Sequence, residues 1–184
     1  MSTETILRPT GTGDLSEAMG ELADGSDTYP EWVGMYTLVD EETFSSDKIK
    51  AVSTEKRCLF TFTPGTLGSI IEAVTVHAKC AGRWVDGNSH NAYYRPCLKS
   101  GGTIAYGNQV NPPPYTNWTE YSQEFTTNPV TGVAWTLSDL SSLQAGPALS
   151  SNSTSMWSYC GQFWLVIRHR PSSQCRAQII GLGW

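Results

Sequence analysis

Apolar and polar residues alternate along much of the chain with a period of two, which is typical of half-buried β-strands. This pattern predicts strands over residues 4–9, 32–39, 57–63, 69–80, 92–99, 103–106, 119–127, 156–168 and 176–182. In 69–80 the alternation slips near Ile71, where we expect a β-bulge. The last two strands should be central ones, because 163–167 is a continuous aromatic and apolar run.

Turn-forming residues separate the predicted strands. Pro9 and the Gly-Thr-Gly of 11–13 should end the first strand. Residues 14–30 are acidic and rich in small residues, which indicates a surface loop with at most one helical turn over 16–22. The three consecutive prolines of 111–114 lack N–H donors and cannot lie inside a sheet, so this segment should be an exposed, stiff connector.

One helix is predicted, near 136–145. Thr136 is suited to its N-cap, Asp139 would complete a capping box, and Trp135 could act as a hydrophobic staple. Three leucines at 137, 140 and 143 fall on one helical face. Gly146-Pro147 should stop the helix.

About eight short strands and one short helix predict an all-β fold, an antiparallel β-sandwich of the jelly-roll type. An immunoglobulin-like sandwich fits less well, because the chain is long for it and lacks the Cys–Trp–Cys spacing. The 184 residues suit a single β-sandwich domain over 1–184. Composition agrees: only 16% of the residues are charged, and 17 Gly and 10 Pro supply turns.

Charge and cysteine usage narrow the functional classes. The net charge is −5, and the longest basic run is 168–170, so we expect no nucleic-acid partner. No apolar run is long enough to predict a membrane span, and the N-terminus shows no signal peptide, which predicts synthesis in a cytoplasm. Five cysteines without close pairs indicate free, mostly buried thiols rather than zinc ligands.

No residue pattern indicates catalysis. His77, His90 and His169 stand outside any ligand motif, and the pair Glu120 and Glu124 cannot be placed across a cleft from sequence. We therefore expect no enzymatic activity, no catalytic residue, no cofactor and no metal. An unrecognised hydrolase, with His90 and Asp86 as its first candidates, is the weakest alternative.

Aromatic residues are numerous, with seven Trp and eight Tyr. Rings beside loops can stack on sugars or anchor a protein interface at small entropic cost. In the central strand, at least one of Phe163 and Trp164 should be core. The candidate interface residues are Trp84, His90, Pro113, Tyr115, Trp118 and Trp184.

The stretch Asn-Pro-Val-Thr-Gly-Val-Ala-Trp-Thr of 128–136, followed by Asp139, Leu140, Leu143 and Gly146, resembles a pattern in tailed-phage and prophage structural proteins. Residues 7–11 and 39–41 are also similar to the N-terminal portions of those proteins. The resemblance implies a virion component built on a β-sandwich and brings no catalytic residues with it.

The first hypothesis is therefore a structural part of a phage particle, namely a capsid decoration protein that covers or stabilises the shell. It would be made in the host cytoplasm, form a homo-oligomer, and contact major capsid or tail proteins. The alternatives are a tail or tail-fibre-associated protein, or a carbohydrate-binding module on the particle surface that uses Trp84, Trp118 and Tyr115 to bind a glycan.

Overall fold

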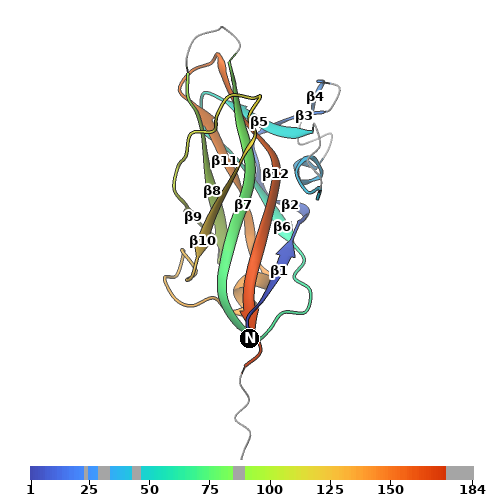
Figure 1. Cartoon of the computed structure of the whole chain (residues 1–184), viewed down its shortest axis with the longest axis vertical. Helices are drawn as coiled ribbons and strands as arrows, with labels where there is room; N and C mark the ends of the chain where they lie inside the picture. Colours follow the sequence, from blue (N-terminus) through green and yellow to red (C-terminus); the bar gives the residue numbers. More distant parts are fainter. Residues whose placement is uncertain (23–24, 29–33, 43–46, 85–89, 173–184) are drawn as a thin grey trace, which may run out of the picture.

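The computed structural model describes residues 1–22, 25–28, 34–42, 47–84 and 90–172. In these ranges the chain forms two stacked antiparallel sheets (Figure 1). The strands are β1 (Thr3–Leu7), β2 (Pro9–Ser16), β3 (Met19–Glu21), β4 (Asp27–Thr28), β5 (Lys48–Val52), β6 (Lys56–Phe62), β7 (Ile70–Trp84), β8 (Ala92–Ser100), β9 (Thr103–Tyr106), β10 (Thr119–Phe125), β11 (Gln144–Ser151) and β12 (Met156–Arg170). Two short helices, η1 (Met35–Leu38) and α1 (Leu137–Ser141), complete the described elements.

The larger sheet, sheet A, has seven strands in the order β10-β7-β12-β5-β3-β4, and β1 also pairs with β12. The long strands β7 and β12 lie side by side along the length of the sandwich (Figure 1). On the edge of β12 that faces away from β7, β5 pairs with residues 157–160 and β1 pairs with residues 165–169. The smaller sheet, sheet B, has the order β2-β6-β11-β8-β9. The predicted antiparallel β-sandwich of jelly-roll type with one short α-helix is confirmed.

The core lies between the two sheets and follows the alternation of the sequence. On β12, Phe163, Leu165 and Ile167 are fully buried. Phe163 packs edge-on against Phe60 of sheet B, with ring centroids 5.7 Å apart. As predicted for the Phe163–Trp164 pair, the first is core, and Trp164 is only half-buried. This packing of large rings across the sheets supplies much of the buried apolar area that stabilises the fold.

Seven strands were predicted within a few residues, namely β1, β6 to β10 and β12. β12 is central, with partners on both edges. The expected bulge is present: the register between β7 and β12 shifts opposite Arg168 and His169, at Glu72. Residues 176–182 lie outside the described residues.

After β1, the first 50 residues differ from the prediction. Pro9 does not end a strand but begins β2, where its missing N–H is tolerated, and 11–13 continue that strand. Gly13 suits this place, because a Cβ there would lie 2.8 Å from the Leu59 carbonyl oxygen. The predicted loop 14–30 contains β3 and β4. Of the run expected as a strand over 32–39, residues 35–38 form the 3-10 helix η1, which buries Met35 and Leu38, and residues 32–33 lie outside the described residues.

The prediction of a capped helix over 136–145 is confirmed at the N-terminal end of the helix and wrong at its C-terminal end. The Thr136 side chain accepts from the Asp139 N–H at 3.1 Å, and the Asp139 carboxylate accepts from the Thr136 N–H at 2.8 Å. Leu140 and Leu143 are buried, whereas Leu137 is 45% exposed. The helix ends at Ser141, because residues from Gln144 onward pair with both β6 and β8 as strand β11.

The 111–114 connector lies outside the named strands, as predicted, and crosses from one sheet to the other. It is less exposed than predicted, because Pro112 is buried. Its Pro113 carbonyl accepts from the Gly82 N–H of β7 at 2.7 Å. No helix within the described ranges is long and apolar enough to cross a membrane.

Candidate functional site

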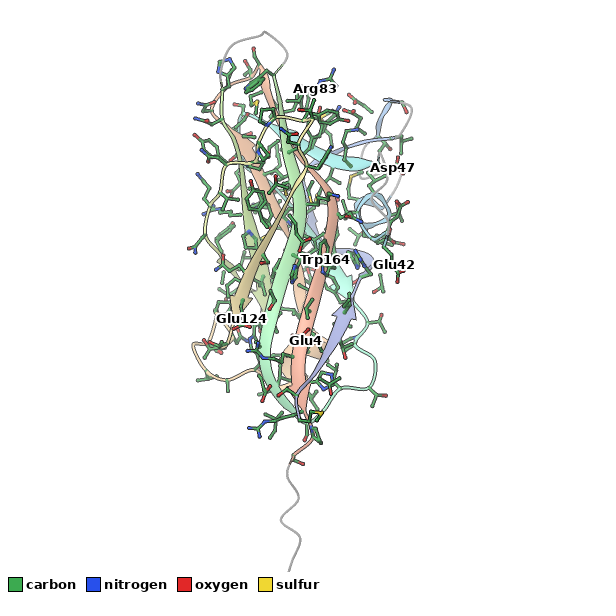
Figure 2. The ribbon with its side chains drawn as sticks, in the orientation of Figure 1. Glu4, Glu42, Asp47, Arg83, Glu124 and Trp164 are labelled. Atoms are coloured by element: carbon green, nitrogen blue, oxygen red, sulfur yellow. The ribbon has the colours of Figure 1, made fainter. Side chains whose placement is uncertain are left out.

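The outer face of sheet A carries the aromatic residues that do not enter the core. On β12 these are Trp157, Tyr159 and Trp164, with Trp164 drawn at the middle of the strand in Figure 2. A register shift between Cys160 and Gln162 moves the outward-facing positions from odd to even numbers. The bulge therefore allows Trp157, Tyr159 and Trp164 to share one face.

Three rings meet near the end of this face where β7 finishes. Tyr159 lies 5.3 Å from Tyr115 and 6.3 Å from Trp118, and the rings of Tyr115 and Trp118 are 5.5 Å apart. Tyr159 is buried beneath the other two, and burial raises the pKa of its hydroxyl. The Lys48 ammonium lies 5.5 Å from the Tyr115 ring, and the Arg83 guanidinium lies 5.7 Å from it. This is an aromatic cluster bordered by cations.

Beside this cluster lies a buried ion network. The Glu21 carboxylate accepts from Lys48 at 2.9 Å and from Lys50 at 2.8 Å, and Lys50 also pairs with Asp27. Both lysine side chains are less than a tenth exposed. Lys50 also lies over the Trp157 ring, 4.6 Å from its centroid. The network holds the ring of Trp157 against β5.

We expect this network to give the protein a broad pH plateau of stability. Burial raises the pKa of Glu21, but hydrogen bonds from Lys50 and Lys48 outweigh it and leave that pKa lowered. Burial lowers the pKa of Lys50, but hydrogen bonds to Asp27 and Glu21 leave it raised. Stability due to Glu21 is therefore lost as pH falls below about 4.5, and that due to Lys50 as pH rises above about 10.5.

Urea unfolding midpoints measured across this pH range test the plateau. In Glu21→Gln the acid limb should become shallower, because the titrating carboxylate is gone. An acid limb of unchanged steepness in that variant would show that other carboxylates produce it.

A second group of side chains crosses the middle of the same face. The rings of Trp164 and His77 are stacked, with centroids 4.9 Å apart and planes 13° from parallel. His77 Nδ1 is 2.9 Å from a Glu120 carboxylate oxygen. Arg8 lies over Trp164, 5.0 Å from the ring centroid. Burial lowers the pKa of Arg8, and its buried Nε and Nη1 have no hydrogen-bond acceptor in the part of the chain that the structure describes.

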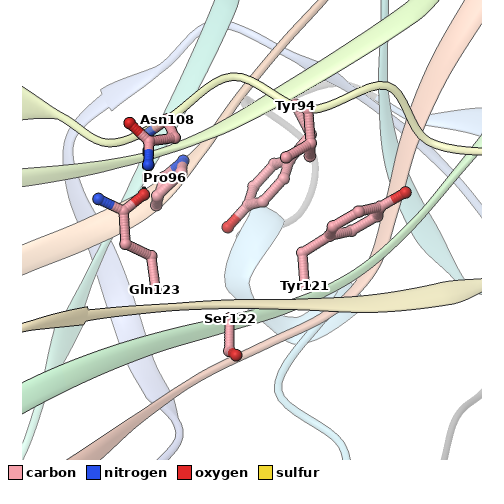
Figure 3. A pocket seen from close by; sticks show the side chains of 7 residues that line it. Tyr94, Pro96, Asn108, Tyr121, Ser122 and Gln123 are labelled. Atoms are coloured by element: carbon pink, nitrogen blue, oxygen red, sulfur yellow. Dashed lines mark hydrogen bonds between the residues drawn. The ribbon is translucent and has the colours of Figure 1, made fainter.

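An edge pocket of about 150 Å³ opens between the two sheets at the side of β10 (Figure 3). Its lining residues are Tyr94, Pro96, Asn108, Val110, Tyr121, Ser122 and Gln123. The segment 107–110 forms one wall, because the Gly107 N–H donates to the Pro96 carbonyl and Val110 pairs with Tyr94. The pocket and the outer face of sheet A lie on opposite sides of β10.

The structure brings only some of the predicted interface residues together. Tyr115 and Trp118 join the aromatic cluster, and Pro113 anchors their connector to β7. Trp84 is 39% exposed at the end of β7, and its indole N–H donates to the His90 carbonyl at 3.0 Å. Trp184 and the loop 85–89, which contains Asp86, lie outside the described residues.

Sequence reasoning missed Trp157, Tyr159 and Arg8 as site residues. Strand alternation alone could have placed Trp157 and Tyr159 on one face, but not beneath a connector some 40 residues away. No group of three or more metal-binding side chains occurs in the part of the chain that the structure describes. The buried cysteines Cys58, Cys80, Cys97 and Cys160 are free thiols, as predicted.

No protein-family model and no curated protein sequence matches the chain. Among solved structures, it is similar to the xylan-binding module CBM15, with 10% identity over 92% of this chain and 100% of that one, at a TM-score of 0.42. It is also similar to the CBM22-1 xylan-binding domain of Paenibacillus barcinonensis Xyn10C, with 9% identity over 72% and 79% of the two chains, at a TM-score of 0.40. A third similar structure is that of TmCBM61 in complex with β-1,4-galactotriose, with 8% identity over 66% of this chain and 70% of that one, at a TM-score of 0.38. These neighbours are carbohydrate-binding modules, and none of their binding residues is transferred to this chain.

Proposed function

We propose that the protein is a binding module for an extended glycan, and that the outer face of sheet A is its binding surface. The observation that carries this proposal is the alternation of aromatic rings with charged groups along that face. Trp157 borders Lys50, the Tyr115–Trp118–Tyr159 cluster borders Lys48 and Arg83, and Trp164 borders Arg8 and His77.

This mixture suits sugar rings. A pyranose has apolar C–H faces that pack on aromatic rings, and a rim of hydroxyls that hydrogen-bond best to charged partners. Trp157 and Trp164 are seven residues apart on β12, which corresponds to about 23 Å at the rise of a β-strand. The face therefore carries a tryptophan at both ends of a stretch long enough for several sugar units. Trp157 offers a ring for stacking, and Trp164 lies between His77 and Arg8.

A protein partner would also use exposed aromatic rings, but the charge pattern favours a glycan. The centres of protein–protein interfaces are depleted of charged residues. Here a cation borders each group of rings, including the exposed Arg83 and also Arg8, whose Nε and Nη1 have no hydrogen-bond partner among the described residues. Charged side chains beside the rings can hydrogen-bond to sugar hydroxyl groups, whereas an apolar protein surface would remove their hydration without replacing it.

Location on a phage particle is a separate proposal, and the sequence resemblance alone supports it. In the structure the residues of that motif have local roles. Asn128 is fully buried and donates to the Ser100 hydroxyl at 2.9 Å, and the Trp135 indole donates to the Phe125 carbonyl at 2.8 Å. Genes for portal, major capsid or tail proteins beside this one would support the virion role, and their absence would count against it.

Affinity electrophoresis against a panel of plant, algal and bacterial polysaccharides tests the glycan proposal. We expect retardation by at least one polysaccharide, and we expect Trp157→Ala and Trp164→Ala each to weaken binding about tenfold or more. The first removes a stacking position, and the second removes the ring that holds Arg8 and His77 in place on the face.

Tyr106→Ala is the matched control, since Tyr106 is an exposed ring on the outer face of sheet B, where it packs on Arg95. This variant should bind normally. Binding lost equally in Tyr106→Ala, or no retardation by any polysaccharide, would contradict the proposal.

A further inference from the structure

The edge pocket is not used by the proposed binding face. β10 separates the two: Ser122 pairs with His77 on the outer face, while Tyr121 and Gln123 line the pocket on the inner side. In Figure 3 the rings of Tyr94 and Tyr121 and the Gln123 amide surround the cavity, whereas the Ser122 hydroxyl points away from Tyr94. The pocket therefore needs its own explanation.

The main polar group at this pocket is the Tyr94 hydroxyl. Tyr94 is only 2% exposed, and its hydroxyl has no hydrogen-bond partner among the described residues. Burial raises the pKa of Tyr94, so the group remains a neutral phenol that can donate. The hydroxyl oxygen itself is not fully buried, so it borders the pocket and can donate to a ligand that enters it.

The neighbouring tyrosine is fixed in place. The Tyr121 hydroxyl donates to the Asn111 carbonyl at 3.2 Å, and its ring lies 6.1 Å from the Tyr94 ring, tilted by 39°. Together with Val110 and Pro96, these rings give the pocket apolar walls. The hydroxyl of Tyr94 is then the polar group at an otherwise apolar wall.

The side-chain amides of Gln123 and Asn108 line the pocket on the side opposite the two tyrosine rings. The Gln123 carbonyl oxygen accepts from the Asn108 N–H at 2.7 Å, which leaves the Gln123 NH₂ group as a donor. The Asn108 side chain offers both a donor and an acceptor. Gly107 permits this arrangement, because a Cβ there would lie 2.3 Å from the Gln123 oxygen.

The size and charge of the pocket define the ligand. A volume of about 150 Å³ corresponds to roughly five water molecules, and a cavity of that size accepts one six-membered ring. No Lys, Arg, His, Asp or Glu lines it, so a charged ligand would lose hydration without compensation. Apolar walls with separate donors and acceptors suit a neutral ring that carries hydroxyl groups.

We propose that the edge pocket binds a single neutral pyranose ring, with one sugar oxygen accepting from the Tyr94 hydroxyl and the ring packed on Tyr121. The sugar class rests on the proposed function, but the site is separate from the outer face of sheet A.

NMR titration of the full chain with methyl pyranosides of the gluco, galacto, manno and xylo series tests the proposal. At least one should shift the backbone amides of Gly107, Asn108 and Gln123, and leave the Trp164 indole unchanged. We expect Tyr94→Phe to weaken binding about tenfold, which corresponds to one hydrogen bond. Val110→Phe should abolish binding by filling the pocket.

The controls separate binding from folding. Tyr94→Phe keeps the ring and removes a hydroxyl without a partner, so its thermal midpoint should not fall. Tyr93→Phe makes the same change one residue earlier, on the other face of β8, and should bind as the native chain does. The matching uronates should bind at least tenfold more weakly. Native affinity in Tyr94→Phe, equal affinity for uronates, or no amide shifts with any pyranoside would overturn the proposal.

The two sites can fail independently. If a polysaccharide binds through Trp157 and Trp164 but no pyranoside shifts the pocket amides, the pocket proposal is wrong and the proposed function stands. If a pyranoside enters the pocket and no polysaccharide is bound at the outer face, the pocket proposal stands and the proposed binding surface is wrong.

Discussion

Replacing Glu21 with alanine is expected to lower the free energy of unfolding by about 3–5 kcal/mol, because it leaves two buried ammonium groups without their shared carboxylate. Lys48 and Lys50 are 4% and 6% exposed at their side chains, and Glu21 is the acid that both contact. Asp27 continues to pair with Lys50, but its carboxylate is 44% exposed and compensates the charge less well. Urea unfolding at neutral pH measures the loss.

Glu124→Ala provides the control for this prediction. Glu124 pairs with Arg168 at 2.8 Å on the same sheet, but both side chains are about two-fifths exposed, so its removal should cost less than about 1 kcal/mol. Similar losses for Glu21→Ala and Glu124→Ala would mean that burial of the lysines adds nothing. The double variant Glu21→Met with Lys48→Met should recover part of the loss, because it removes a carboxylate and an ammonium together.

Gly146→Ala should be at least as damaging, with an expected loss of about 3 kcal/mol or more. Gly146 lies in β11, where a Cβ would stand 1.6 Å from the Cys58 carbonyl oxygen of β6. That oxygen belongs to the backbone and cannot rotate away. The pairing between β11 and β6 is interrupted at Gly146 and Pro147, so the two strands come close there without ladder hydrogen bonds.

Gly65→Ala is the matched control for Gly146→Ala. A Cβ at Gly65 meets no atom within 4 Å, so the substitution should change stability by about 0.5 kcal/mol or less. Thermal unfolding of the two variants, followed by circular dichroism, gives the comparison. A Gly146→Ala protein as stable as the Gly65→Ala protein would show that β11 and β6 separate there at no cost.

The sequence determined the strands whose burial alternates over many residues. β7 and β12 are the longest strands, and their alternation is strong because one face of each packs on the core. The capping box of Thr136 and Asp139 was also readable, since all of its atoms lie within four residues. Local chemistry is sufficient for elements of this kind.

Tertiary contacts decided the segments that local chemistry left open. Lys48–Val52 is a short alternation of polar and apolar residues that was not predicted as a strand. Its two lysines are buried there because Glu21 neutralises them from another strand. Gly146 and Pro147 indicate a helix stop, but pairing with β8 over eight consecutive residues places them inside a strand. In both cases the local sequence did not predict the strand, and pairing with segments distant in sequence formed it.

The same division holds for the candidate sites. The sequence identified Tyr115 and Trp118 as loop rings available for binding, because both lie near the proline-rich connector. It could not bring them onto Tyr159, place Arg8 over Trp164, or leave the Tyr94 hydroxyl without a partner inside a pocket. Residue types and their alternation follow from the sequence alone. Which side chains meet depends on strand order and register, and these are set by the packing of the whole sandwich.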